Sequence, residues 1–316
     1  MKSITFLTHL AKGYPVQRYL GSWGSEFRGK IRVRHYFGLR LVGCSVRRRV
    51  AQRLRAGRTG TLRRELASPA AGVYVFADIE RLTGAEKSKV DSLWHKLAAG
   101  DDPPRVLNQP SRILDRFSLL RMLYEVGIND FNAYLPEEGI DPQRWPVFIR
   151  HRRWHAGVLT GLIANAEELK AVIDGLVVNA YSPEELLIVE FRDTSDSSGI
   201  TRKYGAFKVG DHIFGRHIHF ARDWFLRNPD IKTPESTREE LRYVRSDDHH
   251  ELLERVFTLS GVDYGRLDYT AQDGQFYFWE INTNPMILIS ADRQDTLRFD
   301  AHDHFAGRFR EALEDL

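Results

Sequence analysis

The sequence predicts an α/β protein built from two domains. With 316 residues, of which 42% are hydrophobic, the chain can bury more than one core. Strand and helix patterns alternate over the first hundred residues, which is typical of an α/β layer. Asp101-Asp102-Pro103-Pro104 then interrupts the pattern. We therefore expect an N-terminal α/β domain over residues 1–104 and a second domain over residues 105–316.

The N-terminal part contains short β-rich runs at residues 3–9 and 30–42, a basic helical stretch at 46–64, and an apolar strand at 72–78. A helix should follow, because Thr83 and Glu86 have the spacing of a capping box. Gly100 marks its expected end.

The second part opens with Ser111, which we expect to cap a helix running to Val126 and stopped by Gly127. A strand is expected over 145–150. A polar loop containing Gly157, a second strand over 158–163 and a helix capped by Asn165 should come next.

An apolar strand over 186–191 is followed by a predicted hairpin over 201–219 that turns at Gly210-Asp211. Because side chains alternate along a strand, Lys203 and Arg202 should lie on opposite faces, and we expect Lys203 to face the site. Arg216 and His217 on the return strand are candidates for substrate contact.

Two prolines predict an irregular surface connection over 224–245. A helix capped by Asp247 or Asp248 should then run to Gly261, and a last helix should cover 299–316. Adjacent His249 and His250 diverge on a helix, so we expect no zinc site there.

The stretch at 265–285, GRLDYTAQDGQFYFWEINTNP, carries the strongest functional signal. Asp-Gly between two alternating apolar runs predicts a β-hairpin. A two-residue turn would place Asp268 opposite Trp279, on the face that Glu280 does not share. A three-residue turn at 272–274 places Asp268 opposite Phe278. We predict the second register, in which one face carries Arg266, Asp268, Glu280 and Asn282.

Two carboxylates, an amide and a cation on one face form an oxygen-rich cluster. Mg²⁺ takes one or two carboxylates and completes its octahedron with phosphate oxygens and water. The cluster therefore predicts a site for Mg²⁺ that carries nucleotide phosphates. The simpler alternative is a surface hairpin with solvated charges, which would not need so aromatic a setting.

The pattern R-x-D, a turn and E-x-N-x-N-P resembles the metal-binding end of the ATP-grasp superfamily of carboxylate–amine ligases. The resemblance implies that Asp268, Glu280 and Asn282 hold two Mg²⁺ ions, with Glu280 between them. It also implies that Arg266 contacts the reacting phosphate or acyl group.

The same resemblance implies an ATP-grasp core with a small mobile lid subdomain at about 145–190 and a Rossmann-like N-terminal domain that helps bind the carboxylate substrate. Arg150, where the family often has lysine, would grip the α- and β-phosphates of ATP, and Lys203 would lie beside the transferring phosphate. The segment at the end of the strand over 186–191, which would be the hinge between this lid and the core, would bind adenine and ribose through Glu190, Phe191 and Asp193.

The implied function is an ATP-dependent ligase that activates a small-molecule or peptide carboxylate as an acyl phosphate and joins it to an amine. Two alternatives stay open. An enzyme of the same superfamily could phosphorylate an acceptor without ligation, and a non-catalytic module could bind nucleotide as a switch.

Charge and composition limit the partners. The formal net charge is +3, but residues 28–64 contain no Asp or Glu. We expect a solvated surface there rather than nucleic-acid binding, because no nucleic-acid motif accompanies it. We expect no signal peptide, because the apolar run near the N-terminus is short and lacks a small-residue cleavage site. Together with the lone Cys44, this expectation favours a cytoplasmic protein. No apolar run reaches about eighteen residues, so we expect no membrane span. A homodimer is left open.

Overall fold

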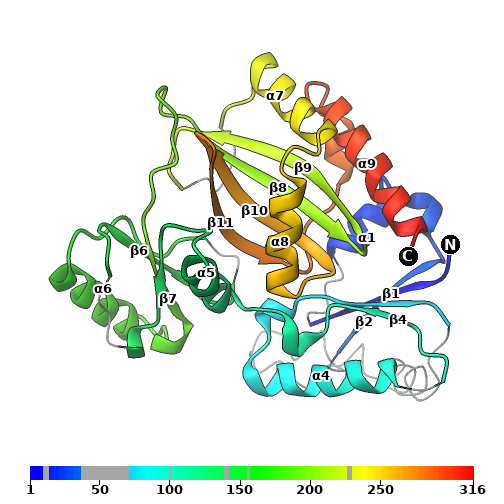
Figure 1. The fold of residues 1–316 in the computed structure, drawn as a ribbon, viewed down its shortest axis with the longest axis horizontal. Helices are drawn as coiled ribbons and strands as arrows, with labels where there is room; N and C mark the ends of the chain where they lie inside the picture. Colours follow the sequence, from blue (N-terminus) through cyan, green and yellow to red (C-terminus); the bar gives the residue numbers. More distant parts are fainter. Residues whose placement is uncertain (10–13, 37–70, 100, 139–141, 155–156, 226–229) are drawn as a thin grey trace.

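The computed structural model of the protein describes residues 1–9, 14–36, 71–99, 101–138, 142–154, 157–225 and 230–316. The described chain forms three β-sheets with helices packed around them, which confirms the α/β class (Figure 1). The basic stretch at 46–64, Cys44 and the end of the run at 30–42 lie outside the described residues.

The first sheet is parallel, in the order β2-β1-β3-β4. Its strands are β1 (Ile4–Thr8), β2 (Ile31–His35), β3 (Val73–Phe76) and β4 (Arg105–Leu107). β4 thus lies just beyond the expected boundary at residue 104. Helix α4 (Gly84–Ala98) runs beneath this sheet in Figure 1 and has the predicted capping box of Thr83 and Glu86. Helix α1 (Tyr14–Gly21) was not predicted.

The second sheet, called here the small sheet, is antiparallel in the order β5-β7-β6. It consists of β5 (Ala133–Tyr134), β6 (Val147–His151) and β7 (Leu186–Glu190), and α6 (Ala166–Val178) belongs to the same part of the chain. The strand predicted over 158–163 is wrong. Only Val158 and Ile163 form isolated bridges back to β6, whose regular partner is β7.

Helix α5 (Arg116–Glu125) begins later than predicted. Residues Pro110–Arg112 form a short 3₁₀ turn instead, and Asp115 caps α5 by accepting a hydrogen bond from the Ser118 N–H at 2.9 Å. The predicted end is confirmed, since Gly127 follows the helix with φ +70°.

The third sheet, called here the large sheet, is antiparallel in the order β11-β10-β8-β9. Its strands are β8 (Thr201–Val209), β9 (His212–Ala221), β10 (Tyr264–Gln272) and β11 (Gln275–Asn282). The turn at Gly210-Asp211 is confirmed by the pairing of Val209 with His212. Near this turn α9 (Phe299–Glu314) packs Phe305 and Phe309 on the sheet.

The irregular connection predicted over 224–245 is wrong, because Pro234 starts helix α7 (Pro234–Arg245). Proline is favoured at the first position of a helix, where its missing N–H costs nothing. Helix α8 (His250–Ser260) ends at Gly261 as predicted, with His249 at its cap in place of Asp247 or Asp248. Across all these described segments, no helix is both long and apolar enough to cross a membrane.

The register of the β10–β11 hairpin differs from the prediction. The turn has two residues, Asp273 and Gly274, with φ +50° and +76°, and Gln272 pairs with Gln275. The predicted three-residue turn is therefore wrong. A β-bulge next to Asp268 shifts the pairing by one residue and leaves Trp279 as the extra residue.

Because of this bulge, Asp268 lies opposite Glu280 and Arg266 lies opposite Asn282. The four side chains consequently share one face, as the functional argument required. The bulge does what the longer turn was expected to do.

A polar junction ties the end of this hairpin to the first sheet. Thr283 donates from its hydroxyl to Glu80, and the Asn284 amide donates to Asp78 at 3.0 Å. Asn108, which follows β4, hydrogen-bonds the backbone at Phe76, Asp263 and Tyr264.

Candidate active site

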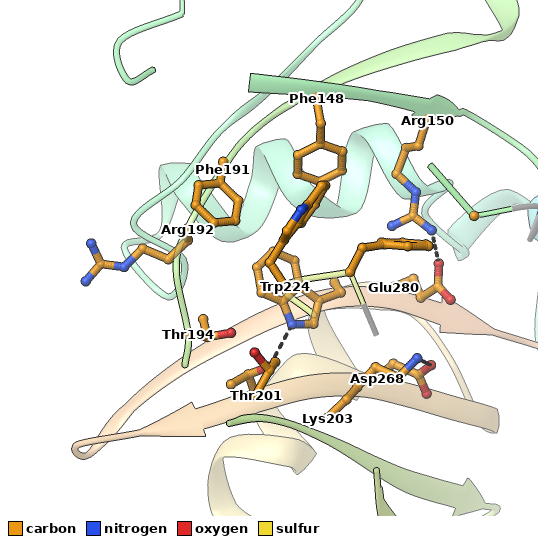
Figure 2. Close-up of a pocket in the computed structure, with 14 residues that line it drawn as sticks. Phe148, Arg150, Phe191, Arg192, Thr194, Thr201, Lys203, Trp224, Asp268 and Glu280 are labelled. Carbon is orange, nitrogen blue, oxygen red and sulfur yellow. Dashed lines mark hydrogen bonds and ion pairs between the residues drawn. The ribbon is translucent and has the colours of Figure 1, made fainter. Parts of the chain in front are cut away.

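A cavity of about 240 Å³ lies between the small sheet and the large sheet (Figure 2). Both sheets and the chain that follows β7 and β9 contribute to its lining. The residues are Phe148, Arg150, Gly157, Phe191, Arg192, Thr194, Thr201, Lys203, Trp224, Phe225, Asp268, Thr270, Trp279 and Glu280.

One side of the cavity is aromatic. The Trp224 ring lies 5.2 Å from the Phe148 ring and 5.3 Å from the Phe191 ring, centroid to centroid. Figure 2 shows the Trp224 indole directly beside these two rings. A cavity side lined by aromatic rings suits a flat aromatic group such as a nucleotide base.

The other side carries charges, and Asp268 is its first centre. Arg266 donates from Nε to Asp268 Oδ1 at 2.6 Å and from Nη2 to Oδ2 at 3.1 Å. Lys203 Nζ lies 3.8 Å from Oδ2. Burial alone would lower the pKa of Arg266, but the adjacent Asp268 outweighs it and raises the pKa above its usual value.

The choice of Lys203 over Arg202 agrees with this geometry, because Lys203 lines the cavity. Arg202 instead pairs with Asp196 and Glu239.

Glu280 is the second charged centre. Arg116 Nη2 and Arg150 Nη2 each lie 2.6 Å from the same oxygen, Oε2. Burial lowers the pKa of Arg150 to about 10, and the neighbouring Arg116 adds to the effect. A guanidinium with this pKa is still positively charged at neutral pH, so two cations face one carboxylate.

Arg116 is the site residue that the sequence did not reveal. It is the first residue of α5, and its Nη1 donates to the carbonyls of His151 at 2.6 Å, Arg152 at 3.2 Å and Trp154 at 3.3 Å. A cation is unfavourable at a helix N-terminus because of the helix dipole. With the start of α5 placed correctly at Arg116, an arginine in this unfavourable position would have indicated a functional role.

The donors expected to hold metal are arranged as two carboxylates and one amide. Asp268 and Glu280 lie directly opposite each other, and Asn282 follows on the same face, where its Oδ1 accepts from the Asn284 N–H at 2.8 Å. No group of three or more acidic, His or Cys residues that could hold a metal occurs within the described parts of the chain. These hard oxygen donors fit Mg²⁺ that keeps phosphate and water ligands, and they do not form an all-protein cage.

Two of the three hinge residues do not present their side chains to the cavity. The Glu190 carboxylate is 1% exposed and accepts from the Tyr134 hydroxyl and from the backbone N–H groups of Asn132, Gln143 and Arg144. Asp193 accepts from the N–H and hydroxyl of Ser195 in a local turn.

Among the predicted hinge residues, only Phe191 lines the cavity. Side-chain contacts from Glu190 and Asp193 to a nucleotide are therefore not supported by this geometry. Arg192 and Thr194, which were not predicted, line it instead.

Comparison with known proteins identifies the fold. No family model matches the sequence, and no curated protein sequence matches it. The structure is similar to that of a D-alanine–D-alanine ligase from Coxiella burnetii, with a TM-score of 0.51 and 11% sequence identity over 99% of this chain and 98% of that chain.

Two further solved structures are similar over most of the chain. A D-alanine–D-alanine ligase from Bacillus anthracis complexed with ATP has a TM-score of 0.49 and 13% identity, covering 100% of both chains. A RimK domain protein ATP-grasp from Sphaerobacter thermophilus has a TM-score of 0.47 and 13% identity, covering 97% of this chain and 99% of that one. The chain has the ATP-grasp fold, as the hairpin motif predicted.

Proposed function

We propose that the protein is an ATP-dependent carboxylate–amine ligase. The observation that carries this proposal is the single face of the hairpin on which Arg266, Asp268 and Glu280 meet, with the Arg116, Arg150 and Lys203 cations beside them. Such a face matches the needs of phosphoryl transfer, which depends on positioning and on stabilising phosphate charge.

In this proposal the aromatic side of the cavity takes the base of ATP and the cations take its phosphates. Arg150 reaches the phosphates from β6, which belongs to the proposed lid, while Arg116 reaches them from the start of α5 and Lys203 from β8. Asp268, Glu280 and Asn282 hold Mg²⁺, which when bound neutralises phosphate charge. To do so, Glu280 must exchange its arginine partners for the metal while the arginines turn to phosphate.

Arg266 stabilises the negative charge that develops when the substrate carboxylate attacks the γ-phosphorus. The resulting acyl phosphate is then open to attack by an amine, which displaces phosphate and forms the C–N bond. The substrates in this proposal are small molecules or peptides, and the N-terminal domain expected over residues 1–104 helps to bind the carboxylate substrate. The lone cysteine supports a cytoplasmic setting.

The test is ADP release in the presence of ATP, Mg²⁺ and an equimolar pool of the twenty L-amino acids and D-alanine. Glu280→Gln keeps the shape of the side chain and removes its charge, so ADP release should fall by about 100-fold or more. Glu239→Gln, which alters a carboxylate paired with Arg202, is the matched control and should keep wild-type turnover. Full turnover in Glu280→Gln would contradict the assignment.

Hydroxylamine separates ligation from simple phosphorylation. It converts an acyl phosphate to a hydroxamate, so a ligase should form hydroxamate at the expense of amide product. ADP release without any hydroxamate would favour a kinase of the same fold.

A further inference from the structure

Two stacked imidazoles lie beside the charged centre, on β9. The rings of His217 and His219 have centroids 3.9 Å apart and are inclined by only 5°. The sheet register places His219 opposite Lys203 and His217 opposite Gly205, while Asp268 on β10 lies opposite Gly205 from the other side. His217, Gly205 and Asp268 therefore form one row across the sheet, on the same face as the Lys203 and Asp268 side chains that line the cavity.

Gly205 makes room for the His217 ring. A Cβ atom at residue 205 would lie 2.7 Å from His217 Nε2 and 2.8 Å from its Cε1, closer than side chains tolerate. The edge of the imidazole that carries Nε2 thus lies over the β8 backbone and extends toward β10. Any side chain at residue 205 would displace it.

His217 Nε2 is buried and has no hydrogen-bond partner within the described part of the chain, and the residue is only 4% exposed. Buried polar atoms are nearly always hydrogen-bonded, so an exception beside a reaction centre needs an explanation. As an acceptor, Nε2 would suit an N–H group supplied by a ligand.

The charges around the pair are mostly positive. Arg216 and Arg298 lie nearby with Arg266 and Lys203, against the carboxylates of Asp268 and of Glu240, which pairs with Arg298. Burial first, and then these cations together with the neighbouring imidazole or lysine, lower the pKa of both histidines well below its usual value. Both rings are therefore neutral, which is also what allows them to stack.

The same surroundings act on a ligand. Burial and nearby positive charge disfavour an ammonium group, so they lower the pKa of an amine bound there. A neutral amine keeps the lone pair that it needs to attack an acyl group.

We propose that His217 binds the attacking amine of the ligase reaction, with Nε2 accepting a hydrogen bond from the N–H of a neutral amine held over Gly205. This proposal rests on the proposed function. In the step itself the amine nitrogen forms the C–N bond, the acyl C–O bond breaks with its electron pair leaving on phosphate, and the departing N–H proton passes to His217 Nε2. The role requires the tautomer that carries its proton on Nδ1.

The first experiment uses His217→Phe, which keeps a ring against His219 and removes the acceptor. With the amino-acid pool as probe, amide formation should fall by about 100-fold, the lower range for a positioned proton acceptor. Hydroxamate formation with hydroxylamine in molar excess should stay at the wild-type rate, because the acyl phosphate still forms. Gly205→Ala should reproduce this split by displacing the ring.

His212→Phe is the matched control. His212 lies at the far end of the same strand, where it pairs with Asp315, so neither product should change. If amide and hydroxamate fall together in His217→Phe, or if neither falls, the proposal is overturned. Absence of hydroxamate from the wild-type enzyme would instead overturn the ligase function and this proposal with it.

A second measurement does not depend on turnover. Side-chain ¹⁵N NMR of the wild-type protein should show His217 neutral, with Nδ1 protonated and Nε2 bare, from pH 6 to 8. A protonated Nε2 would contradict the proposal, since that atom would then donate and could not accept.

Discussion

Arg116 uses the two ends of one guanidinium for different purposes. Its Nη1 donates to three backbone carbonyls at and just after the end of β6, while its Nη2 donates to Glu280. The fixed end orients the other end, which in the proposed function exchanges Glu280 for phosphate without losing its support. A lysine ammonium has its donors on one atom and cannot serve both sides.

Arg116→Lys should therefore raise the KM for ATP by about tenfold or more, the equivalent of one hydrogen bond to a charged group. Arg121→Lys changes an arginine of the same helix that pairs with Glu138 at the surface, and it should leave the KM unchanged. The measurement is steady-state ADP release as a function of ATP concentration. Equal KM values for the two variants would show that Arg116 does not contact ATP.

Asp78 is a carboxylate in an unfavourable place. It is 2% exposed, and burial, followed by the charge of Glu80, raises its pKa from 3.8 to about 6. The folded protein therefore holds a proton between pH 4 and 6 that the unfolded chain has already released. Stability falls as pH rises through this window, and the full penalty persists above pH 6.

Asp78→Asn should remove that penalty. The residue has φ +59°, a conformation that asparagine adopts readily, so the substitution should introduce no backbone strain. At pH 7.5 the variant should exceed wild type by on the order of 2–3 kcal/mol in free energy of unfolding, and the difference should shrink toward pH 4.5. Urea unfolding at the two pH values is the measurement.

Asp273→Asn is the control for that experiment, because Asp273 is an exposed aspartate that also has positive φ. Its replacement should shift the free energy of unfolding by the same small amount at both pH values. A constant difference for Asp78→Asn as well would exclude the raised pKa as its cause.

At the scale of elements, the hairpin shows what local pattern can and cannot decide. The Asp-Gly turn and the two strands could be predicted from the sequence, because they depend on residues that are neighbours along the chain. Asp268 and Glu280 are an even number of residues apart, and a two-residue turn puts such pairs on opposite faces. Either an odd turn or a bulge resolves the conflict. The protein uses the bulge. Trp279 is the extra residue there, and its Nε1 donates a hydrogen bond to the Thr270 hydroxyl.

Gly274→Ala should destabilise the protein by about 1 kcal/mol, because Gly274 has φ +76°. Activity per folded molecule should not change, since the bulge and not the turn brings Asp268 and Glu280 together. Gly307→Ala, in α9 with open space around it, should stabilise by about 0.5–1 kcal/mol. Thermal unfolding gives the stability of both variants, and ADP release gives their activity. A loss of turnover in Gly274→Ala would mean that the turn, and not the bulge, sets the strand register that brings Asp268 and Glu280 together.

Other elements divide along the same line. The capping box at Thr83 and the glycine stops at Gly127 and Gly261 were predicted correctly because each is a local signal. Pro234 was misread as a break because proline starts helices as well as ending them. That 158–163 would form only isolated bridges to β6 could not be predicted, since strand pairing depends on contacts outside the stretch itself.

For the whole molecule, the sequence predicted the fold and the hairpin face, but not the groups that tertiary structure brings to them. Arg116 reaches Glu280 from 164 positions away in sequence. Glu190 marked the right strand end, yet its carboxylate is satisfied by backbone groups of the segment before β6. Such contacts have no local pattern.

Asn108 links the first sheet to the large sheet. It is fully buried with φ +65°, and its amide joins Phe76 to the backbone at Asp263 and Tyr264. Asn108→Ala should cost about 3 kcal/mol or more, because several buried backbone groups lose their partner at once. We expect the wild type to unfold in a single transition and Asn108→Ala to unfold in two.

Asn179→Ala at the exposed C-terminal end of α6 is the comparison. It removes one hydrogen bond, to the Gly175 carbonyl, so we expect a cost of about 0.5–1 kcal/mol and one transition. Calorimetry distinguishes the outcomes. A single transition in Asn108→Ala, merely shifted, would show that the two sheets stay coupled through other contacts such as Thr283–Glu80.

The charges at the hairpin have an effect beyond the cavity itself. Arg116, Arg150, Arg266 and Lys203 outnumber Asp268 and Glu280, so these six side chains keep an excess of positive charge even with every carboxylate paired. A charged cleft attracts oppositely charged ligands over a distance set by the ionic strength, about 8 Å in physiological salt. ATP should thus be steered into the cleft, and its association rate constant should decrease as salt is added.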